Sequence, residues 1–499
     1  MNERVAVIDV GSNSVRLVVF DGAARSPAYF FNEKVLAGLG TGLAQSGYLH
    51  PEGRRRAMAA LHRFAALLQR MRPARTMTIA TAAVRDAIDG PEFCAQVLAE
   101  TGLALTVASG PEEGRLSAQG VLLGWPEAEG MVCDIGGASL ELAQISGGQV
   151  LAAETAPLGP LPLLDLKATP RELRKRIKRD MAKLRSNFSG PVPRLFLVGG
   201  SWRAVARLDM ARRKYPLHVL HEYERPTDDV MRVADWISRQ EPAHLATVTD
   251  TSLDRLRLLP TAALVLMRLL KDLRPETVAF SSYGIREGML YEAMPPDVRA
   301  LDPLIEACRY TETQNARFPG FGDALYGWLQ NLFGDLPADD LRLMRAACLL
   351  HDTTWRAHPD YRADMCFEEV TRANMGGVDH AGRLFLAVAN RARYKNDGSA
   401  VDDHPAIALL AADRVKLATA IGRAMRLGAM LGGAHPDTLP DTELQLMDGQ
   451  LRLELHGPAR ELMGEVVERR LNGLNTALGL TEPARLVCDG ATLPATPAP

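Results

Sequence analysis

Three short loops in the first 201 residues combine small residues with hydroxyls, and each follows an apolar stretch. The first loop consists of Gly11, Ser12, Asn13 and Ser14. A turn of this kind presents several backbone N–H groups in one concave spot, which suits an anion. Arg16, two residues beyond the turn, offers a planar fork of donors that matches phosphate. Asp9 ends the apolar stretch and carries a carboxylate of the kind that binds Mg²⁺ directly or through water.

The same order of residues recurs 125 positions later. Apolar residues end at Asp134, and Glu141 lies in the alternating stretch beyond the turn. The turn consists of Gly136, Gly137, Ala138 and Ser139. A third loop consists of Gly199, Gly200 and Ser201. A helical pattern follows this third loop, and a helix N-terminus favours an anion. Two Asp-ended strands with equivalent turns predict a duplicated fold whose loops face one cleft.

Hydrophobic patterning places these loops on alternating strands and helices. In the first part we expect a hairpin at 4–20, strands at 75–80 and 103–108, and helices at 52–71, 91–101 and from about 112. In the second part we expect strands at 130–134, 139–146, 149–155 and 194–199, and helices at 170–187, 201–212, 226–240 and 260–271. This alternation predicts an α/β class. From residue 298 helical periodicity dominates, with a hairpin at 441–457 around an Asp448-Gly449 turn.

Length and charge narrow the possible functions. A chain of 499 residues divides into several domains. The formal net charge of −2 argues against a general nucleic-acid binder, so a polyanionic substrate needs a local basic channel. The six cysteines show no C-x-x-C pairing, no apolar run approaches the length of a membrane span, and the N-terminus lacks the apolar core of a signal peptide. We therefore expect a cytoplasmic protein that does not associate with membranes.

Six motifs carry a resemblance to a known family. They are DVGSNSVR (9–16), ATAAVRDA (80–87), SGPEEGRL (109–116), DIGGASLEL (134–142), VGGS (198–201) and YGIREGML (283–290). In this order they resemble the exopolyphosphatase and guanosine pentaphosphate phosphohydrolase (Ppx/GppA) family, within the actin, sugar-kinase and Hsp70 ATPase superfamily. The resemblance implies two ribonuclease-H-like, actin-like ATPase subdomains around a cleft, at 1–128 and 129–297. A helical HD-like region at 298–490 and a disordered tail at 491–499 would follow.

The resemblance also implies roles for particular residues. By themselves, Glu112 and Glu113 are acidic residues in the first turn of a helix capped by Ser109. The family's general base is the second Glu of this motif, which is Glu113 here. The resemblance gives Arg85 a contact with phosphate and implicates Glu141 in catalysis. Asp9 and Asp134 would hold Mg²⁺, with Mn²⁺ as an alternative. The family often has a third glycine where Ala138 stands, so this loop departs from the pattern.

Several substrates fit these motifs. The first candidate is inorganic polyphosphate, hydrolysed from its end, and the second is the 5′ γ-phosphate of guanosine pentaphosphate (pppGpp). Residues 171–185 hold eight Lys or Arg and favour polyphosphate, either as a guide for the chain or merely as a solvated helix face. A non-hydrolytic polyphosphate or alarmone binder, a sugar-kinase-like ATPase and phosphotransfer to ADP are further alternatives. The resemblance implies a homodimer, and no motif indicates sequence-specific nucleic-acid binding.

Charged residues outside the loops carry weaker expectations. Arg203 and Arg207 would extend the phosphate track, whereas Arg286 and Glu287 would form a structural ion pair. His351-Asp352 resembles the metal-binding pair of HD-type phosphohydrolases. The expected first histidine is absent from 310–318, and His358, His380 and His404 are not in a convincing ligand spacing. A buried hydrogen-bonded pair is therefore the preferred interpretation of His351-Asp352.

Overall fold

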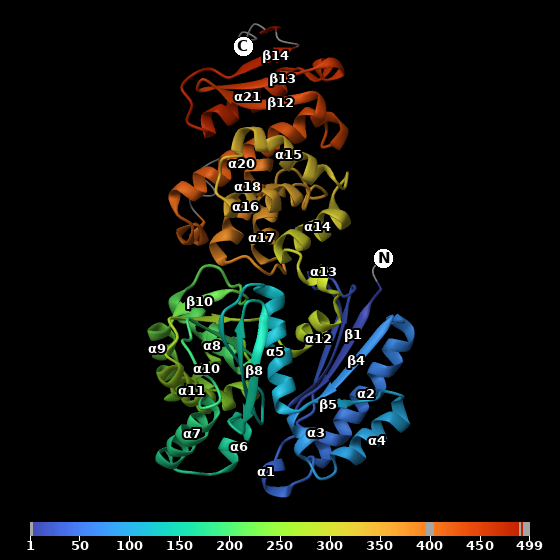
Figure 1. Ribbon diagram of the computed structural model, residues 1–499, viewed down its shortest axis with the longest axis vertical. Coiled ribbons are helices and arrows are strands. Elements are labelled where there is room, and N and C mark those ends of the chain that lie inside the picture. The colour runs from blue at the N-terminus through green and yellow to red at the C-terminus, as the bar shows by residue number, and fades with distance from the viewer. Residues whose placement is uncertain (1–2, 396–403, 489–490, 493–499) are drawn as a thin grey trace. The chain divides into compact units, whose positions relative to one another are not determined.

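The structure of this chain is a computed structural model that describes residues 3–395, 404–488 and 491–492 (Figure 1). The chain divides into two compact units, Met1–Pro303 and Leu304–Pro499. Each unit has its own hydrophobic core. The three phosphate-loop motifs all belong to the first unit.

The first unit begins with a five-stranded sheet in the order β3-β2-β1-β4-β5. Its strands are β1 (Val5–Val10), β2 (Ser14–Phe20), β3 (Tyr29–Leu36), β4 (Arg75–Ala80) and β5 (Thr106–Val107). Helices α1 (Leu43–Ser46), α2 (Pro51–Met71), α3 (Ala82–Asp86) and α4 (Gly90–Thr101) accompany it. β1 pairs antiparallel with β2 and parallel with β4, so the loops after β1 and β4 meet at one edge.

A six-stranded sheet in the order β10-β11-β9-β6-β7-β8 repeats this arrangement. Its strands are β6 (Gly130–Ile135), β7 (Leu140–Ser146), β8 (Gln149–Ala156), β9 (Arg194–Val198), β10 (Tyr223–Pro226) and β11 (Thr277–Phe280). β6 pairs antiparallel with β7 and parallel with β9, as β1 does with β2 and β4. Its helices are α6 (Pro160–Asp165), α7 (Pro170–Arg185), α8 (Gly200–Arg213), α9 (Thr227–Ser238), α10 (Pro242–Ala246) and α11 (Leu253–Leu273). The predicted duplication is confirmed.

Two helices lie between the sheets, α5 (Gly110–Gly124) and α12 (Ile285–Ala293), as Figure 1 shows. α5 follows the first sheet in sequence, yet it packs its apolar side on the second, where Val121 and Leu122 contact Phe196. α12 follows the second sheet and packs Leu290 against β1 and β2 of the first. The short α13 (Pro296–Arg299) ends this part of the chain. Each of these two helices thus packs on the sheet of the other half, and the two helices cross one another.

The second unit is mainly helical. Its helices are α14 (Pro303–Asn315), α15 (Phe321–Phe333), α16 (Ala338–Leu349), α17 (Arg362–Arg372), α18 (His380–Tyr394), η1 (Pro405–Leu409), α20 (Ala412–Leu431), η2 (Pro436–Asp441), η3 (Gly457–Leu462) and α21 (Glu465–Ala477). A sheet in the order β12-β13-β14-β15 completes it. Its strands are β12 (Thr442–Met447), β13 (Gln450–Leu455), β14 (Arg485–Cys488) and β15 (Ala491–Thr492). Within the described ranges, no helix is both long and apolar enough to cross a bilayer.

Most predicted elements agree with the structure within a few residues, and the differences have local causes. The expected strand at 103–108 is reduced to β5, which pairs with β4 at only two positions. The helix expected at 260–271 begins at Leu253 and continues through Pro260, although proline usually marks a helix start or break. The predicted hairpin around Asp448-Gly449 is confirmed, and both turn residues have positive φ, of 52° and 78°.

The predicted disordered tail at 491–499 is wrong at its start. Ala491 and Thr492 form β15 and pair with Cys488 and Val487 of β14. The remainder of that prediction, 493–499, lies outside the described residues. All six cysteines are free thiols, consistent with the absence of a disulfide pattern in the sequence.

We predict that Gly288→Ala destabilises the protein through the crossing of α5 and α12. A methyl group on Gly288 would stand 1.8 Å from the Leu116 carbonyl oxygen, so the two helix backbones must move apart. We expect a loss of about 1–3 kcal/mol in unfolding free energy, measured by denaturant unfolding. Gly327→Ala in α15 is the control, because nothing lies within 4 Å of its added methyl group. An equal effect of the two substitutions would contradict this account of the crossing.

Candidate active site

The three loops meet around one cavity of about 200 Å³ in the first unit. Of the residues predicted for the site, fifteen line it. They are Asp9, Gly11, Ser12, Asn13, Ser14, Arg16, Glu113, Asp134, Gly136, Gly137, Ser139, Glu141, Gly199, Gly200 and Ser201. Ala138 and Arg85 do not line the cavity. The Ala138 carbonyl instead accepts a hydrogen bond from the Gly159 N–H at 3.2 Å, and its φ is not positive, so alanine fits this turn without backbone strain.

The first two loops have the same turn geometry. The Gly11 N–H donates to the Ser14 carbonyl at 2.9 Å, and the Gly136 N–H donates to the Ser139 carbonyl at 3.0 Å. Each turn joins an antiparallel pair of strands, and residues beside the turn line the cavity, Asp9 and Ser14 in the first hairpin and Ile135 and Ser139 in the second.

The strand register places different residues opposite the two aspartates. Asp9 faces Arg16 across β1 and β2, whereas Asp134 faces Glu141 across β6 and β7. Equivalent positions of the duplicated hairpins therefore supply a cation to one side of the cavity and a carboxylate to the other.

The first turn of α5 decides which of two adjacent glutamates faces the cavity. Glu112 caps the helix: it accepts from the Ser109 N–H at 2.9 Å, and its own N–H donates to the Ser109 hydroxyl at 3.3 Å. Glu112 is exposed to solvent. Successive helical residues point about 100° apart, so Glu113 turns inward and is only 4% exposed.

Arg85 reaches Glu113 from the N-terminal end of α5. Its guanidinium forms an ion pair with the Glu113 carboxylate and also donates to the Ala108 carbonyl at 3.2 Å. Arg85 thus contacts the predicted base, although it does not itself line the cavity.

Burial and mutual repulsion act on the two glutamates together. Burial raises the pKa of Glu113, the nearby Glu141 raises it further, and Arg85 opposes both effects. Burial and Asp134 raise the pKa of Glu141, and hydrogen bonds from Ser139 and Thr155 oppose the shift. The protein surroundings by themselves therefore disfavour the ionised form of both glutamates at neutral pH.

The aspartates provide oxygen donors of the type that suits a hard cation. The Ser117 hydroxyl donates to one oxygen of Asp134, and desolvation raises the pKa of both Asp134 and Asp9. A divalent cation between such groups would relieve their repulsion and restore their normal ionisation. Mg²⁺ usually binds through one or two carboxylates together with substrate phosphates and water. The residues present fit that ion.

Five cations also line the cavity, and sequence reasoning predicted only some of them for the site. The side chains are Arg16, Lys34, Arg203, Arg255 and Arg286. Burial lowers the pKa of Lys34 to about 8, and the neighbouring arginines, Arg255 first, contribute. Lys34 on β3 and Arg255 on α11 lie in no recognisable motif, so only the fold brings them here. The expected track residue Arg203 lines the cavity, but Arg207 is exposed and does not.

The predicted ion pair between Arg286 and Glu287 is wrong. Glu287 accepts hydrogen bonds from the Gly284 N–H at 2.8 Å and the Tyr29 hydroxyl at 3.0 Å, which fixes the start of α12. Arg286 lines the cavity instead, with its Nε 3.8 Å from an Asp9 oxygen. Glu287 caps the start of α12, so its carboxylate does not pair with Arg286. The Arg286 guanidinium lines the cavity instead.

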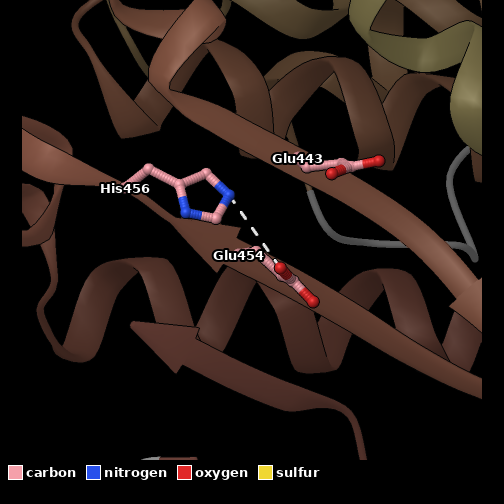
Figure 2. Close-up of side chains that lie close together, drawn as sticks. All are labelled: Glu443, Glu454 and His456. Carbon is pink, nitrogen blue, oxygen red and sulfur yellow. Dashed lines mark ion pairs between the residues drawn. The ribbon is translucent and has the colours of Figure 1, made fainter. Parts of the chain in front are cut away.

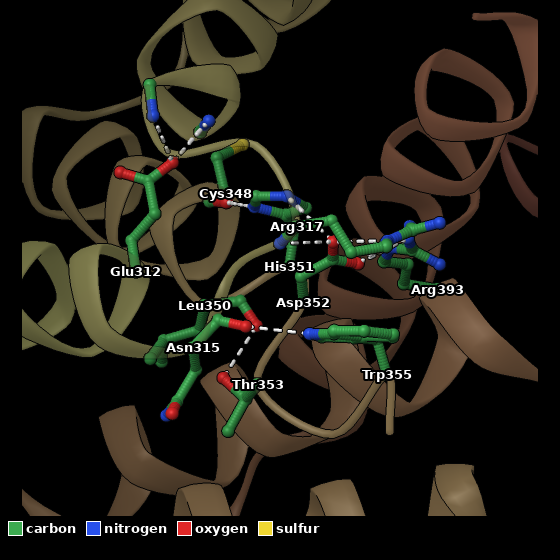
Figure 3. A network of polar contacts seen from close by, with 12 residues as sticks. Glu312, Asn315, Arg317, Cys348, Leu350, His351, Asp352, Thr353, Trp355 and Arg393 are labelled. Carbon is green, nitrogen blue, oxygen red and sulfur yellow. Dashed lines mark hydrogen bonds and ion pairs between the residues drawn. The ribbon is translucent and has the colours of Figure 1, made fainter. Parts of the chain in front are cut away.

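In the second unit, His351-Asp352 does not fit a metal site (Figure 3). The buried Asp352 carboxylate accepts from Arg317 at 2.8 Å and from Arg393 at 3.1 Å. Two guanidinium groups therefore occupy the positions that a metal ion would need. The ring Nδ1 of His351 lies 2.8 Å from the Cys348 carbonyl oxygen. Burial lowers the pKa of His351 to about 4. The preferred interpretation, a buried hydrogen-bonded pair, agrees with these contacts.

Another group in the second unit resembles a metal site more closely (Figure 2). Glu443 and Glu454 are paired across β12 and β13, and Nε2 of His456 lies 3.9 Å from Glu454. One ligand atom from each lies within 4.8 Å of the others. The His456 side chain is 46% exposed. Half-exposed charged groups of this kind are common on hairpins, and we assign them no catalytic role.

The duplicated sheets and the loops that meet between them define the class of protein. This is the two-domain fold of the actin-like ATPase superfamily, with a helical C-terminal region. A model of the Ppx/GppA phosphatase family matches residues 18–296, more than half of the chain, and one described as "Exopolyphosphatase, C-terminal" matches 327–482. The chain belongs to the Ppx/GppA phosphatase family, whose members hydrolyse phosphoanhydrides.

Solved structures agree with this assignment. A Ppx/GppA enzyme of Aquifex aeolicus is 26% identical, with a TM-score of 0.50, over 58% of this chain and 99% of that chain. Another structure of the Aquifex aeolicus family member is 25% identical, with a TM-score of 0.50, over 58% and 96%. An exopolyphosphatase of Cytophaga hutchinsonii shares the fold at 20% identity, with a TM-score of 0.53, over 58% and 96%.

We predict that Glu141→Gln raises the melting temperature of the metal-free protein at pH 8. The folded-state pKa of Glu141 lies above its unfolded value, so ionisation destabilises the fold as pH rises from about 4.5 toward that raised pKa. The neutral amide removes this cost, so we expect a gain of a few degrees at pH 8 and little difference at pH 4. Calorimetry at the two pH values measures it. A variant less stable than wild type at pH 8 would contradict the charge repulsion described above.

Proposed function

We propose that the protein is a Mg²⁺-dependent exopolyphosphatase that releases orthophosphate from the ends of inorganic polyphosphate. The observation that carries the proposal is the group of five cations that line the cavity together with the carboxylates, Arg16, Lys34, Arg203, Arg255 and Arg286. Consecutive phosphates each carry negative charge, so several cations in one cavity suit a phosphate chain. None of the described residues that line the cavity is aromatic, so the lining offers no ring to stack on a guanine base.

In this proposal the loops and cations hold the terminal phosphate, and Glu113 acts as general base. The ionised carboxylate takes a proton from a water molecule, and the water oxygen forms a bond to the terminal phosphorus. The bridging bond breaks, and the bridging oxygen leaves with the shortened chain. Positioning and charge neutralisation supply most of the rate enhancement in phosphoryl transfer. Asp9 and Asp134 would hold Mg²⁺, which when bound neutralises charge on the phosphates.

Hydrolysis of the 5′ γ-phosphate of pppGpp is the second candidate. It would use the same base, loops and metal, because the reacting end of the substrate is again a terminal phosphoanhydride. What differs is the part beyond the phosphates, where a nucleoside needs a pocket for its base. The match of the C-terminal residues to an exopolyphosphatase model adds support for polyphosphate.

The test compares phosphate release from long-chain polyphosphate and from pppGpp, with Mg²⁺, for wild type, Glu113→Gln and Glu112→Gln. We expect polyphosphate to turn over faster, Glu113→Gln to lower kcat by about 10²-fold or more, and Glu112→Gln to remain within severalfold of wild type. Glu112 is the matched control because it is the adjacent carboxylate and serves as a cap. Preferential cleavage of pppGpp would overturn the choice of substrate, and an active Glu113→Gln would overturn the base.

The pH dependence tests the environment of Glu113 separately. An ordinary glutamate is fully ionised above about pH 6 and would give a flat profile there. Because burial and Glu141 raise the pKa of Glu113, we expect kcat/KM to keep rising above pH 6 at low Mg²⁺. Arg85 lowers this pKa, so Arg85→Gln should move the rise to higher pH. Added Mg²⁺ should move it to lower pH, since a divalent cation favours the ionised carboxylates. A flat profile for all forms would contradict the assignment.

A further inference from the structure

A basic groove lies between α7 and α11 of the first unit, apart from the cavity described above. It has a volume of about 210 Å³. Its floor is apolar, with the buried Ile177 of α7 and the half-buried Leu264 and Met267 of α11. The exposed cations Arg174, Lys178 and Lys271 form its rim. This groove includes part of the basic run 171–185, which the active site does not use.

The acidic residues near this groove are already engaged. Asp180 forms ion pairs with Arg176 and Arg179, and Asp272 forms one with Arg268. Glu172 caps the start of α7, where it accepts from the Thr169 N–H at 2.9 Å. The rim cations Arg174, Lys178 and Lys271 make no ion pair with any residue that the structure describes.

Three unpaired cations around an apolar floor create a local positive field. Low-dielectric walls strengthen such a field because water cannot screen it fully. The chain as a whole carries a net charge of −2, so this field belongs to the groove and not to the molecule in general.

The position of the groove limits what can reach it from the active site. Arg255 lines the cavity, and Lys271 lies 16 residues further along the same helix. At 1.5 Å per residue this is about 24 Å along the axis. Residues 255 and 271 also point to different sides of α11, so a connecting ligand must pass around the helix. Only an extended polyanion bridges the two places.

We infer that the groove formed by Arg174, Lys178 and Lys271 binds a remote part of a long polyphosphate chain while its end lies in the active site. This inference rests on the proposed function. Binding at two places makes the second contact intramolecular, which strengthens the binding of long chains without any change in the chemical step. Short substrates reach only the cavity. The protein therefore favours long polyphosphate through affinity, and the field of the groove weakens as salt is added.

The test uses the full-length chain with substrates of graded length. The groove variant is Arg174→Gln/Lys178→Gln/Lys271→Gln, and all three side chains are exposed, so the fold should tolerate it. The matched control, Arg171→Gln/Lys175→Gln/Lys183→Gln, removes the same charge from exposed positions of α7 outside the groove. For wild type we expect KM to fall about tenfold or more once the chain spans the distance. The groove variant should lose this fall, and tripolyphosphate kinetics should stay within twofold.

Binding measurements separate this inference from the proposed function. Long-chain polyphosphate and tripolyphosphate are titrated onto Glu113→Gln, with and without the groove substitutions, at low and high salt. Selective weakening of long-chain binding by the groove substitutions supports the groove even if wild type hydrolyses nothing, in which case the proposed function fails alone. Equal weakening by the groove and control substitutions, or no weakening, overturns the groove and leaves α7 as a solvated helix.

Discussion

The crossing of α5 and α12 is the constraint on which the active site depends. Glycines stand where the two backbones touch: a methyl group on Gly120 would lie 2.3 Å from the Gly284 carbonyl oxygen. Each helix packs on the sheet of the opposite half, so the crossing ties both halves together. Glu113 lies in the first turn of α5 and Arg286 in the first turn of α12. The packing of these two helices therefore positions two charged groups that line the cavity.

The duplication explains how one cavity obtains two kinds of charge. Both halves use a strand that ends in aspartate, a turn closed by a glycine N–H, and a returning strand. At one equivalent position the first half has Arg16 and the second has Glu141. In the proposed function the shared backbone supplies N–H groups for phosphate from both halves. The difference at this position places a guanidinium in one half and a carboxylate in the other.

Charge in the cavity is balanced only in part by the protein itself. Buried carboxylates repel one another, and five cations line the same cavity. Such repulsion costs folding free energy, and it is a common property of sites that must bind a charged ligand. Asp352 in the second unit differs from these carboxylates, because it forms ion pairs with two guanidinium groups, those of Arg317 and Arg393. The Asp352 carboxylate therefore has a structural role, because its positively charged partners are side chains of this chain.

The sequence by itself determined the loops, the duplication and the family, because these depend on short motifs whose geometry is local. It left Glu112 and Glu113 as adjacent candidates until the capping of α5 separated them. It missed Lys34 and Arg255, since cations at strand and helix positions carry no pattern until distant elements converge. It assigned Glu287 to the wrong partner, because the N–H of Gly284 becomes a competitor only when α12 forms. Tertiary structure decided which charged groups share the cavity, because burial and approach depend on packing that no single segment contains.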